Sequence, residues 1–292
     1  MINVIKYYYN MKNISIHKVG KKVFVKHIND IYFLQEIDNQ EKVLEIYNLL
    51  KCNNNFYSFV INKDQSIFTP YNGKIFVLLR KYILNSVNMI RNVVIEKNIV
   101  DKLQLNRKKW QNLWERKIDY YEYQMNHIYG KFPIIDESID YYIGMTETAI
   151  SFFYYNHLEG DDGQLVACHH RVIDDEFEIH NPLNVVVDYR ERELGEYLKT
   201  IFWSNDYRNK NLYELLKSFN CSKVGYYRLY ARMLYPSYYF DAYDKIVNEN
   251  EKQTELYEIL LRVEEYEMYL VKVHEIISSF FELPNIDWLK KI

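Results

Sequence analysis

Glycine, proline and cysteine are scarce in this chain of 292 residues, which contains 8, 5 and 3 of them. So few glycine and proline residues leave no visible flexible linker. The cysteines lie far apart and form no Cys-x-x-Cys pair, which argues against a zinc knuckle or a disulfide framework and suits a reducing compartment. No apolar run approaches the roughly 20 residues of a membrane-spanning helix, and the N-terminus lacks the pattern of a signal peptide. We therefore expect neither feature.

A strong excess of charge is also missing, because the formal net charge is -3. This balance argues against nucleic acid or an anionic membrane as a partner. Hydrophobic residues make up 48% and charged residues 26%, as in globular proteins, and the length fits one large domain or a two-lobed one. Tyrosine is abundant, with 30 copies. Its abundance has two explanations, codon bias in an AT-rich genome or oxidative cross-linking in a protective assembly.

The first eighty residues alternate between apolar and polar side chains, the pattern of half-buried strands. We expect strands at residues 14–19, 23–28, 31–37, 57–62, 66–69 and 74–79. A capping-box-like start at Asp38 and apolar residues at helical spacing predict one helix at residues 40–51. The sequence therefore predicts a small sheet that carries a single helix.

The remainder of the chain is mainly helical in pattern, with Pro133, Pro236 and Pro284 as stops. The expected helices are residues 87–105, 110–129, 138–157, 212–219, 223–234, 238–248 and 251–281. A β-rich lobe at residues 1–83, a joint near residues 82–86 and a helical lobe at residues 84–292 make an α+β, bilobal protein kinase-like fold. The segment from Cys168 to Lys199 adds a loop, a buried strand at residues 185–187 that ends in Asp188, and an amphipathic helix.

Four segments carry a family resemblance: residues 114–122 (WERKIDYYE), 141–150 (YYIGMTETAI), 168–171 (CHHR) and 187–198 (VDYRERELGEYL). In this order they resemble the YutH-type spore coat proteins, which belong with the CotS-like coat proteins and the aminoglycoside phosphotransferase fold. The likeness covers residues 110–201, and the small lobe matches only in architecture. It implies other spore coat proteins as partners, synthesis in the mother-cell cytoplasm and a location in the spore coat.

Phosphoryl transfer in this fold depends on a phosphate cradle, a strand lysine, a helix glutamate, a catalytic aspartate and Mg²⁺ ligands. Three of these elements are missing here. Gly20 is the only glycine of the first hairpin turn, and Gln35 stands where the lysine is expected. Arg171 stands where the resemblance places the catalytic aspartate, and arginine accepts no proton at a usable pH.

Other residues could replace the missing groups, although each of them also fits a role without chemistry. Lys26 is a candidate for a relocated lysine, with Glu41 or Glu45 as its helix partner, yet all three fit a solvated surface. His169 or His170 is a candidate base, because histidine titrates near neutral pH. Adjacent residues on an extended segment point to opposite sides, so at most one histidine faces the cleft.

Asp188 fits the position of the magnesium-binding aspartate. The alternative is a carboxylate that caps the next helix or pairs with Arg190 or Arg192. A second metal ligand is not clear from the sequence. Its candidates are Asp174, Asp175, Glu176, Asn181 and Asn184. A metal cluster of Cys168, His169, His170 and His180 is disfavoured, because adjacent residues cannot all converge on one ion.

We therefore interpret the chain as a catalytically inactive kinase-fold protein with a structural or scaffolding role in the spore coat. The main alternative is an active, atypical phosphotransferase that uses ATP and Mg²⁺ on a small molecule or a coat protein. A module that binds nucleotide without catalysis lies between the two.

Overall fold

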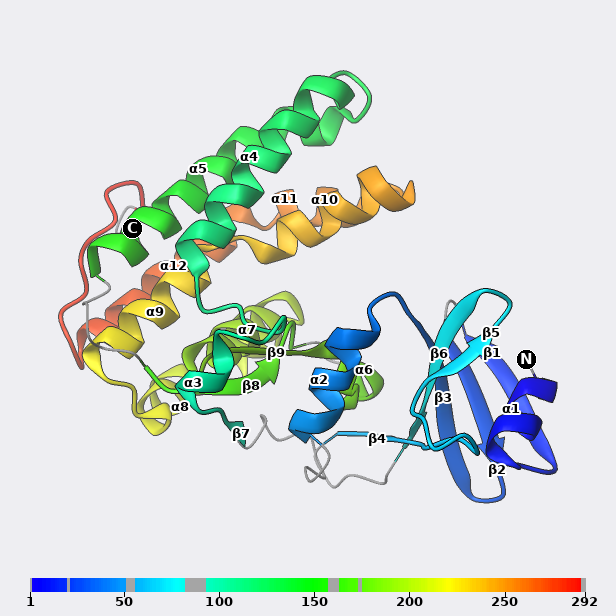
Figure 1. The fold of residues 1–292 in the computed structure, drawn as a ribbon. Coiled ribbons are helices and arrows are strands. Elements are labelled where there is room, and N and C mark those ends of the chain that lie inside the picture. Colours follow the sequence, from blue (N-terminus) through cyan, green and yellow to red (C-terminus); the bar gives the residue numbers. More distant parts are fainter. Residues whose placement is uncertain are drawn as a thin grey trace. The chain divides into compact units, whose positions relative to one another are not determined.

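The computed structural model describes residues 2–19, 22–50, 56–81, 93–156, 163–172 and 175–289. The chain divides into two compact units, whose helices and strands are labelled in Figure 1. Met1–Asn106 and Ala167–Val187 form the first, which we call the sheet unit, and Arg107–Val166 and Asp188–Ile292 form the second, the helical unit. The predicted joint at residues 82–86 lies outside the described residues, so the predicted boundary between residues 83 and 84 stays a prediction.

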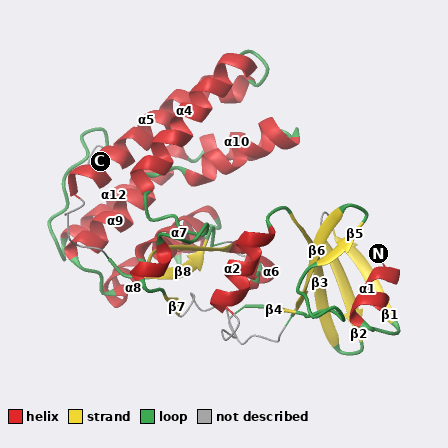
Figure 2. Ribbon diagram, in the orientation of Figure 1, coloured by secondary structure: helices red, strands yellow, loops and turns green. Residues whose placement is uncertain are grey.

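The sheet unit contains a six-stranded antiparallel sheet (Figure 2). Its strands are β1 (Ile14–Val19), β2 (Lys22–His27), β3 (Asp30–Ile37), β4 (Ser58–Phe59), β5 (Thr69–Tyr71) and β6 (Lys74–Arg80). The order is β1-β2-β3-β6-β4, and β5 also pairs with β6. The alternating pattern thus predicted β1, β2, β3 and β6 well.

The predicted strands at residues 57–62 and 66–69 are mostly wrong. Only Ser58–Phe59 and Thr69–Tyr71 pair with β6. The intervening chain turns around buried Asn62, whose Oδ1 accepts hydrogen bonds from the backbone N–H groups of Asp64 and Ser66. A side chain that satisfies nearby backbone donors competes with strand pairing.

Each face of this sheet has its own apolar core. One face packs against α1 (Ile2–Tyr9) through Ile5, and the other against α2 (Gln40–Leu50) through Val43. The α2 helix confirms the prediction for residues 40–51. The α1 helix was not predicted, because Ile5 is its one buried residue and gives no periodic pattern.

A second sheet has the order β7-β8-β9, with β7 at Val93–Val94, β8 at Leu165–His169 and β9 at Val185–Tyr189. The strand predicted at residues 185–187 is confirmed as β9. Residues 87–92 of the helix predicted at residues 87–105 lie outside the described residues. From residue 93 onward the prediction holds only for the short helix α3 (Lys97–Val100), and Val93–Val94 form the strand β7 instead. Pairing explains the difference, because Leu105 O accepts from Val187 N at 2.9 Å and Asn106 bridges to Val187.

Two short elements connect β8 to β9, namely α6 (Glu176–His180) and the 3-10 turn η1 (Pro182–Asn184). The helical unit contains α4 (Trp110–Ile128), α5 (Pro133–Asn156), α7 (Glu191–Trp203), the 3-10 turn η2 (Asp206–Arg208), α8 (Leu212–Phe219), α9 (Lys223–Leu234), α10 (Ser237–Glu249), α11 (Thr254–Leu260) and α12 (Val263–Ser278). Within it, α5 packs against α4 and α9, and α7 packs against α9.

Two helix boundaries in this unit differ from the predictions. Pro133 ends the preceding segment as expected, but it also begins α5, since the first helical residue needs no N–H donor. The helix predicted at residues 251–281 is two helices, α11 and α12, which separate near Arg262. None of the helices in the described part of the chain is long and apolar enough to cross a membrane.

Aromatic stacking fills the core of the helical unit. The rings of Tyr142 and Tyr239 stack at 3.7 Å between centroids, and those of Trp114 and Tyr235 at 4.7 Å. Both Tyr142 and Tyr239 are fully buried, whereas Tyr155 is 79% exposed. The abundant tyrosines therefore serve core and surface alike.

Candidate functional site

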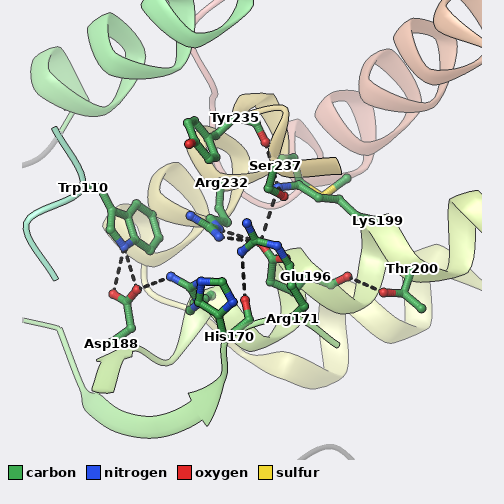
Figure 3. A network of polar contacts seen from close by, with 12 residues as sticks. Trp110, His170, Arg171, Asp188, Glu196, Lys199, Thr200, Arg232, Tyr235 and Ser237 are labelled. Carbon is green, nitrogen blue, oxygen red and sulfur yellow. Dashed lines mark hydrogen bonds and ion pairs between the residues drawn. The ribbon is translucent and has the colours of Figure 1, made fainter. Parts of the chain in front are cut away.

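Asp188 is the penultimate residue of β9 and is completely buried in the helical unit. Trp110 Nε1 donates to its two carboxylate oxygens at 2.8 and 2.9 Å, and Arg192 Nη1 donates to Oδ2 at 2.7 Å (Figure 3). The backbone N–H of Tyr189 donates to Oδ1 at 2.7 Å. Asp188 accepts every one of these bonds, which is the pattern of an ionised carboxylate.

Opposing forces act on this carboxylate. Burial raises the pKa of Asp188 overall, although the charge of Arg192, the hydrogen bond from Trp110 and the charge of Arg232 act to lower it. Arg107 belongs to the same surroundings, because burial and the charge of Arg192 lower its pKa and the charge of Asp188 opposes them. Positive side chains therefore already neutralise Asp188 from several directions.

These surroundings do not fit Mg²⁺. A magnesium site requires oxygen atoms free to coordinate the ion, and nearby guanidinium groups repel a divalent cation. Over the residues that the structure describes, no group of three or more His, Cys, Asp or Glu side chains gathers to hold a metal ion. The ion pair of Asp188 with Arg192, which the sequence allowed, is present.

A second buried ionic network lies farther along α7. Arg232 Nε donates to Glu196 Oε1 at 2.7 Å, and Lys199 Nζ lies 3.5 Å from the same oxygen (Figure 3). Lys199 also donates to the carbonyl oxygen of Tyr235 at 2.8 Å and to Ser237 Oγ at 3.1 Å. Buried charges in native proteins are paired in this way, because an unpaired one is costly.

In the sheet unit, Gln35 lies on β3 and Asn181 Nδ2 donates to its Oε1 at 3.2 Å. Lys22, on the neighbouring strand β2, lies opposite Gln35. Val23 of β2 pairs with Leu34 of β3, and in an antiparallel pair the residue before Val23 faces the residue after Leu34. Both residues line a cavity of about 860 Å³. No local spacing in the sequence relates Gln35 to Lys22, so their shared place at this cavity was not predicted.

Lys26, Glu41 and Glu45 do not gather around Gln35. Lys26 is exposed on β2, in register with Ile31 of β3. Gln104 binds both glutamates, through its Nε2 to Glu41 Oε2 at 2.7 Å and through its backbone N–H to Glu45 at 3.0 Å. The helix carboxylates thus hold the chain near residue 104.

The predicted catalytic loop, in the sheet unit, puts its two histidines in different environments. His169 is buried, with a ring nitrogen 2.6 Å from the carbonyl oxygen of Ile179. His170 is exposed, and its backbone N–H donates to Asn184 O at 2.7 Å. The alternation confirms that the neighbours point to opposite sides. Arg171 Nη1 donates to His170 O at 2.9 Å.

Several other predicted positions can be placed only in part. Gly20 and Asp174 lie outside the described residues, and the side chain of Glu176 is not described. Asp175 caps α6, where its Oδ1 accepts from the backbone N–H groups of Phe177 and Glu178. Asn184 Nδ2 donates to Arg171 O at 3.0 Å. The polar residues described around this loop therefore hold backbone in place.

Comparison with known proteins gives a family. The model described as "Spore coat putative kinase YutH" matches residues 2–273. The endospore coat-associated protein YutH of Bacillus subtilis (strain 168) is 26% identical over 211 residues, which cover 63% of this chain and 62% of that protein. The chain thus spans less than two thirds of that relative's length.

Solved structures give the fold. Spectinomycin phosphotransferase in complex with ADP and spectinomycin superposes with a TM-score of 0.58 at 13% identity, covering 88% of this chain and 90% of that one. An aminoglycoside phosphotransferase from Alicyclobacillus acidocaldarius gives 0.62 at 10% identity, covering 96% of both. These values confirm the predicted α+β, kinase-like fold class. The family match over most of the sequence shows that the chain belongs to the YutH family of spore coat proteins.

Proposed function

We propose that this protein is a structural or scaffolding component of the endospore coat and that it transfers no phosphate. Family membership and the coat association of the Bacillus subtilis relative support the location. Other coat proteins are then its partners, and the mother-cell cytoplasm is where it is made.

The observation that carries the proposal is the bonding of Asp188. Its carboxylate takes an ion pair from Arg192 and hydrogen bonds from Trp110, so it has little capacity left for Mg²⁺. Phosphoryl transfer depends on metal ions that neutralise the developing charge. Gln35 and Arg171 add to this argument, since an amide carries no positive charge and a guanidinium accepts no proton.

The rival, an active atypical phosphotransferase, needs a relocated lysine. Lys26 was its candidate, and the exposure of Lys26 on β2 does not support that role. ATP and Mg²⁺ are the cofactors that this rival would require.

Purified protein mixed with Mg²⁺ and labelled ATP tests the proposal directly. We expect the same background rate for the wild type and Asp188→Asn, and no gain for Gln35→Lys, which restores only the strand lysine. Turnover by the wild type that Asp188→Asn abolishes would sink the proposal. A rise in melting temperature on adding ATP, without turnover, would favour a nucleotide-binding module instead.

The location has its own test. A fluorescent fusion of the full chain, expressed during sporulation, is expected to collect at the spore surface, and the fluorescent protein alone is the control. A fusion that stays dispersed in the mother cell would contradict a coat role.

A further inference from the structure

The strand β1 has a neighbouring strand on one side only. It stands at one end of the order β1-β2-β3-β6-β4 and pairs with β2 over six consecutive positions, without a bulge or a proline. The opposite edge of the sheet is divided between β4 and β5, of two and three residues. Short strands protect an edge, whereas a long unpaired strand offers its backbone N–H and C=O groups to another chain. The β1 edge is therefore the more exposed of the two.

The turn after β2 shows which β2 residues bond to which neighbouring strand. Two residues join His27 to Asp30, and the pair that closes such a turn exchanges backbone hydrogen bonds. Bonded pairs alternate along antiparallel strands, so His27, Val25 and Val23 bond to β3. The residues between and before them then bond to β1, namely Lys22, Phe24 and Lys26.

The same alternation leaves half of the β1 backbone pointing outward. The β1 partners of these β2 residues are every second residue from Ser15 to Val19. The remaining β1 residues turn their backbone N–H and C=O groups away from β2, and they are Ile14, Ile16 and Lys18. In the part of the chain that the structure describes, these groups form no backbone hydrogen bond with another segment.

A second copy of the same strand matches these outward groups. If two β1 strands run antiparallel about a two-fold axis, Ile16 lies opposite Ile16 of the other copy, and Ile14 lies opposite Lys18. Each bonded pair exchanges two hydrogen bonds, so the three outward residues supply about six between the copies.

The side chains favour this register. Ile14 and Ile16 are half-buried at the edge of the core that packs against α1, and a facing copy would cover their exposed parts. Lys18 is exposed, and in this register it lies beside Ile14 of the other copy. A pairing centred on Lys18 would instead bring two ammonium groups together, which is unfavourable. Charge and apolar contact therefore select the pairing centred on Ile16.

We infer that β1 is a self-association edge: two copies of this chain pair their β1 strands antiparallel about Ile16, and one sheet continues into the other. The inference adds a partner, a second copy, to the proposed scaffolding role. It does not depend on the absence of phosphate transfer.

Disulfide cross-linking tests the register. In the inferred dimer, Ser15 lies opposite exposed His17 of the other copy, with Cα atoms about 4.5 Å apart, a separation that suits a disulfide. Ser15→Cys and His17→Cys are mixed and treated with the thiol oxidant diamide. The mixture should form a cross-linked heterodimer, whereas each variant alone should cross-link no more than the wild type. Equal cross-linking by Ser15→Cys alone would show that the register is wrong.

Sedimentation equilibrium of the full chain measures the strength of the pairing. Ile16→Pro removes an outward N–H and keeps the bonds to β2, so it should raise the dimer dissociation constant at least about tenfold, with an unchanged melting temperature. Ile16→Lys sets two like charges opposite each other and should weaken the dimer as well, less so in high salt. Ile28→Lys is the matched control, because Ile28 is 75% exposed in the turn after β2, and it should leave the dimer unchanged.

Two results overturn the inference. One is a wild type that stays monomeric at every concentration and gives no cross-linked heterodimer, which would leave this edge bare or assign it to a different chain. The other is a dimer that persists in Ile16→Pro and Ile16→Lys, and if the first variant fails to fold, the second decides. Neither result concerns phosphate transfer, so the inference and the proposed function can fail separately.

Discussion

Different forces hold together two regions of the molecule. In the sheet unit Phe177 packs on Phe33, and in the helical unit Asp188 pairs with Arg192. Around Phe177, ring contacts and half-exposed ion pairs hold a short helix. Around Asp188, buried side chains of opposite charge form ion pairs. Exposed ion pairs contribute little to the free energy of unfolding, whereas a buried pair is costly to break. The region around Phe177 should therefore open more readily than the region around Asp188.

The largest effect is expected from Arg192→Met. The variant leaves Asp188 buried without its charge partner, which costs about 3–5 kcal/mol of unfolding free energy. Urea denaturation of both proteins measures it. The double variant Asp188→Leu/Arg192→Met is the control, and it should recover most of the loss, because the uncompensated charge is gone. An equal loss in both variants would mean that packing, and not charge, holds this region.

Trp110→Phe is expected to have the next largest effect. It removes the indole N–H that both oxygens of Asp188 accept, at a cost of about 1.5–3 kcal/mol for a hydrogen bond to a charged group. Trp114→Phe is the matched control, because Trp114 is a buried neighbour that stacks on Tyr235. A larger loss in the control would show that ring area dominates.

Lys22→Gln tests the sheet unit and is expected to lower the free energy of unfolding far less than Arg192→Met does. The half-exposed pairs with Asp175 and Glu178 predict a loss of about 0–1 kcal/mol, reduced further by salt. The control is Lys74→Gln, which removes an exposed pair with Glu36. A loss comparable to that of Arg192→Met would erase the distinction between the two regions.

The smallest expected effect is a pH dependence of the stability that the ion pairs of Lys22 with Asp175 and Glu178 contribute. Burial raises the pKa of Asp175, but hydrogen bonds from the backbone N–H groups of Glu178 and Phe177 and the charge of Lys22 lower it below its usual 3.8 overall. A lowered carboxyl pKa means that its stabilisation is present above pH 3.8 and is lost as the pH falls through the folded-state value.

At the alkaline end the sign reverses. Burial lowers the pKa of Lys22, but Glu178 and Asp175 raise it above 10.5 overall, so its stabilisation is present below pH 10.5 and is lost as the pH rises through the folded value. The stability difference between the wild type and Lys22→Gln should therefore be largest between these limits and shrink below pH 3.8. Urea unfolding across pH measures it, and a difference that grows in acid would contradict the assignment.

Local patterns in the sequence predicted what local forces decide. Alternation gave β1 to β3, and the spacing of four residues allowed the pair of Asp188 and Arg192. Trp110 lies 78 residues before Asp188, and no periodicity connects them. Phe177 and Lys22 are likewise joined only by the fold.

Packing also overrode helical patterns. A helix was predicted at residues 87–105, yet Leu105, at the end of that range, and Asn106, just after it, pair with Val187 of β9. The position of Gln35 on β3 was predicted correctly, since the strand pattern is strong. Its neighbour Lys22 was missed as a site residue, because the register of two strands decides which side chains meet.

The buried tyrosines of the helical unit should report unfolding in alkali through their own ionisation. Burial is the first cause that raises the pKa of Tyr142, Tyr239 and Tyr266, and neighbouring phenols and carboxylates add to it. These phenols therefore keep their protons while the helices remain packed. The ultraviolet absorbance of newly formed phenolate should rise abruptly when the core opens, without any added dye.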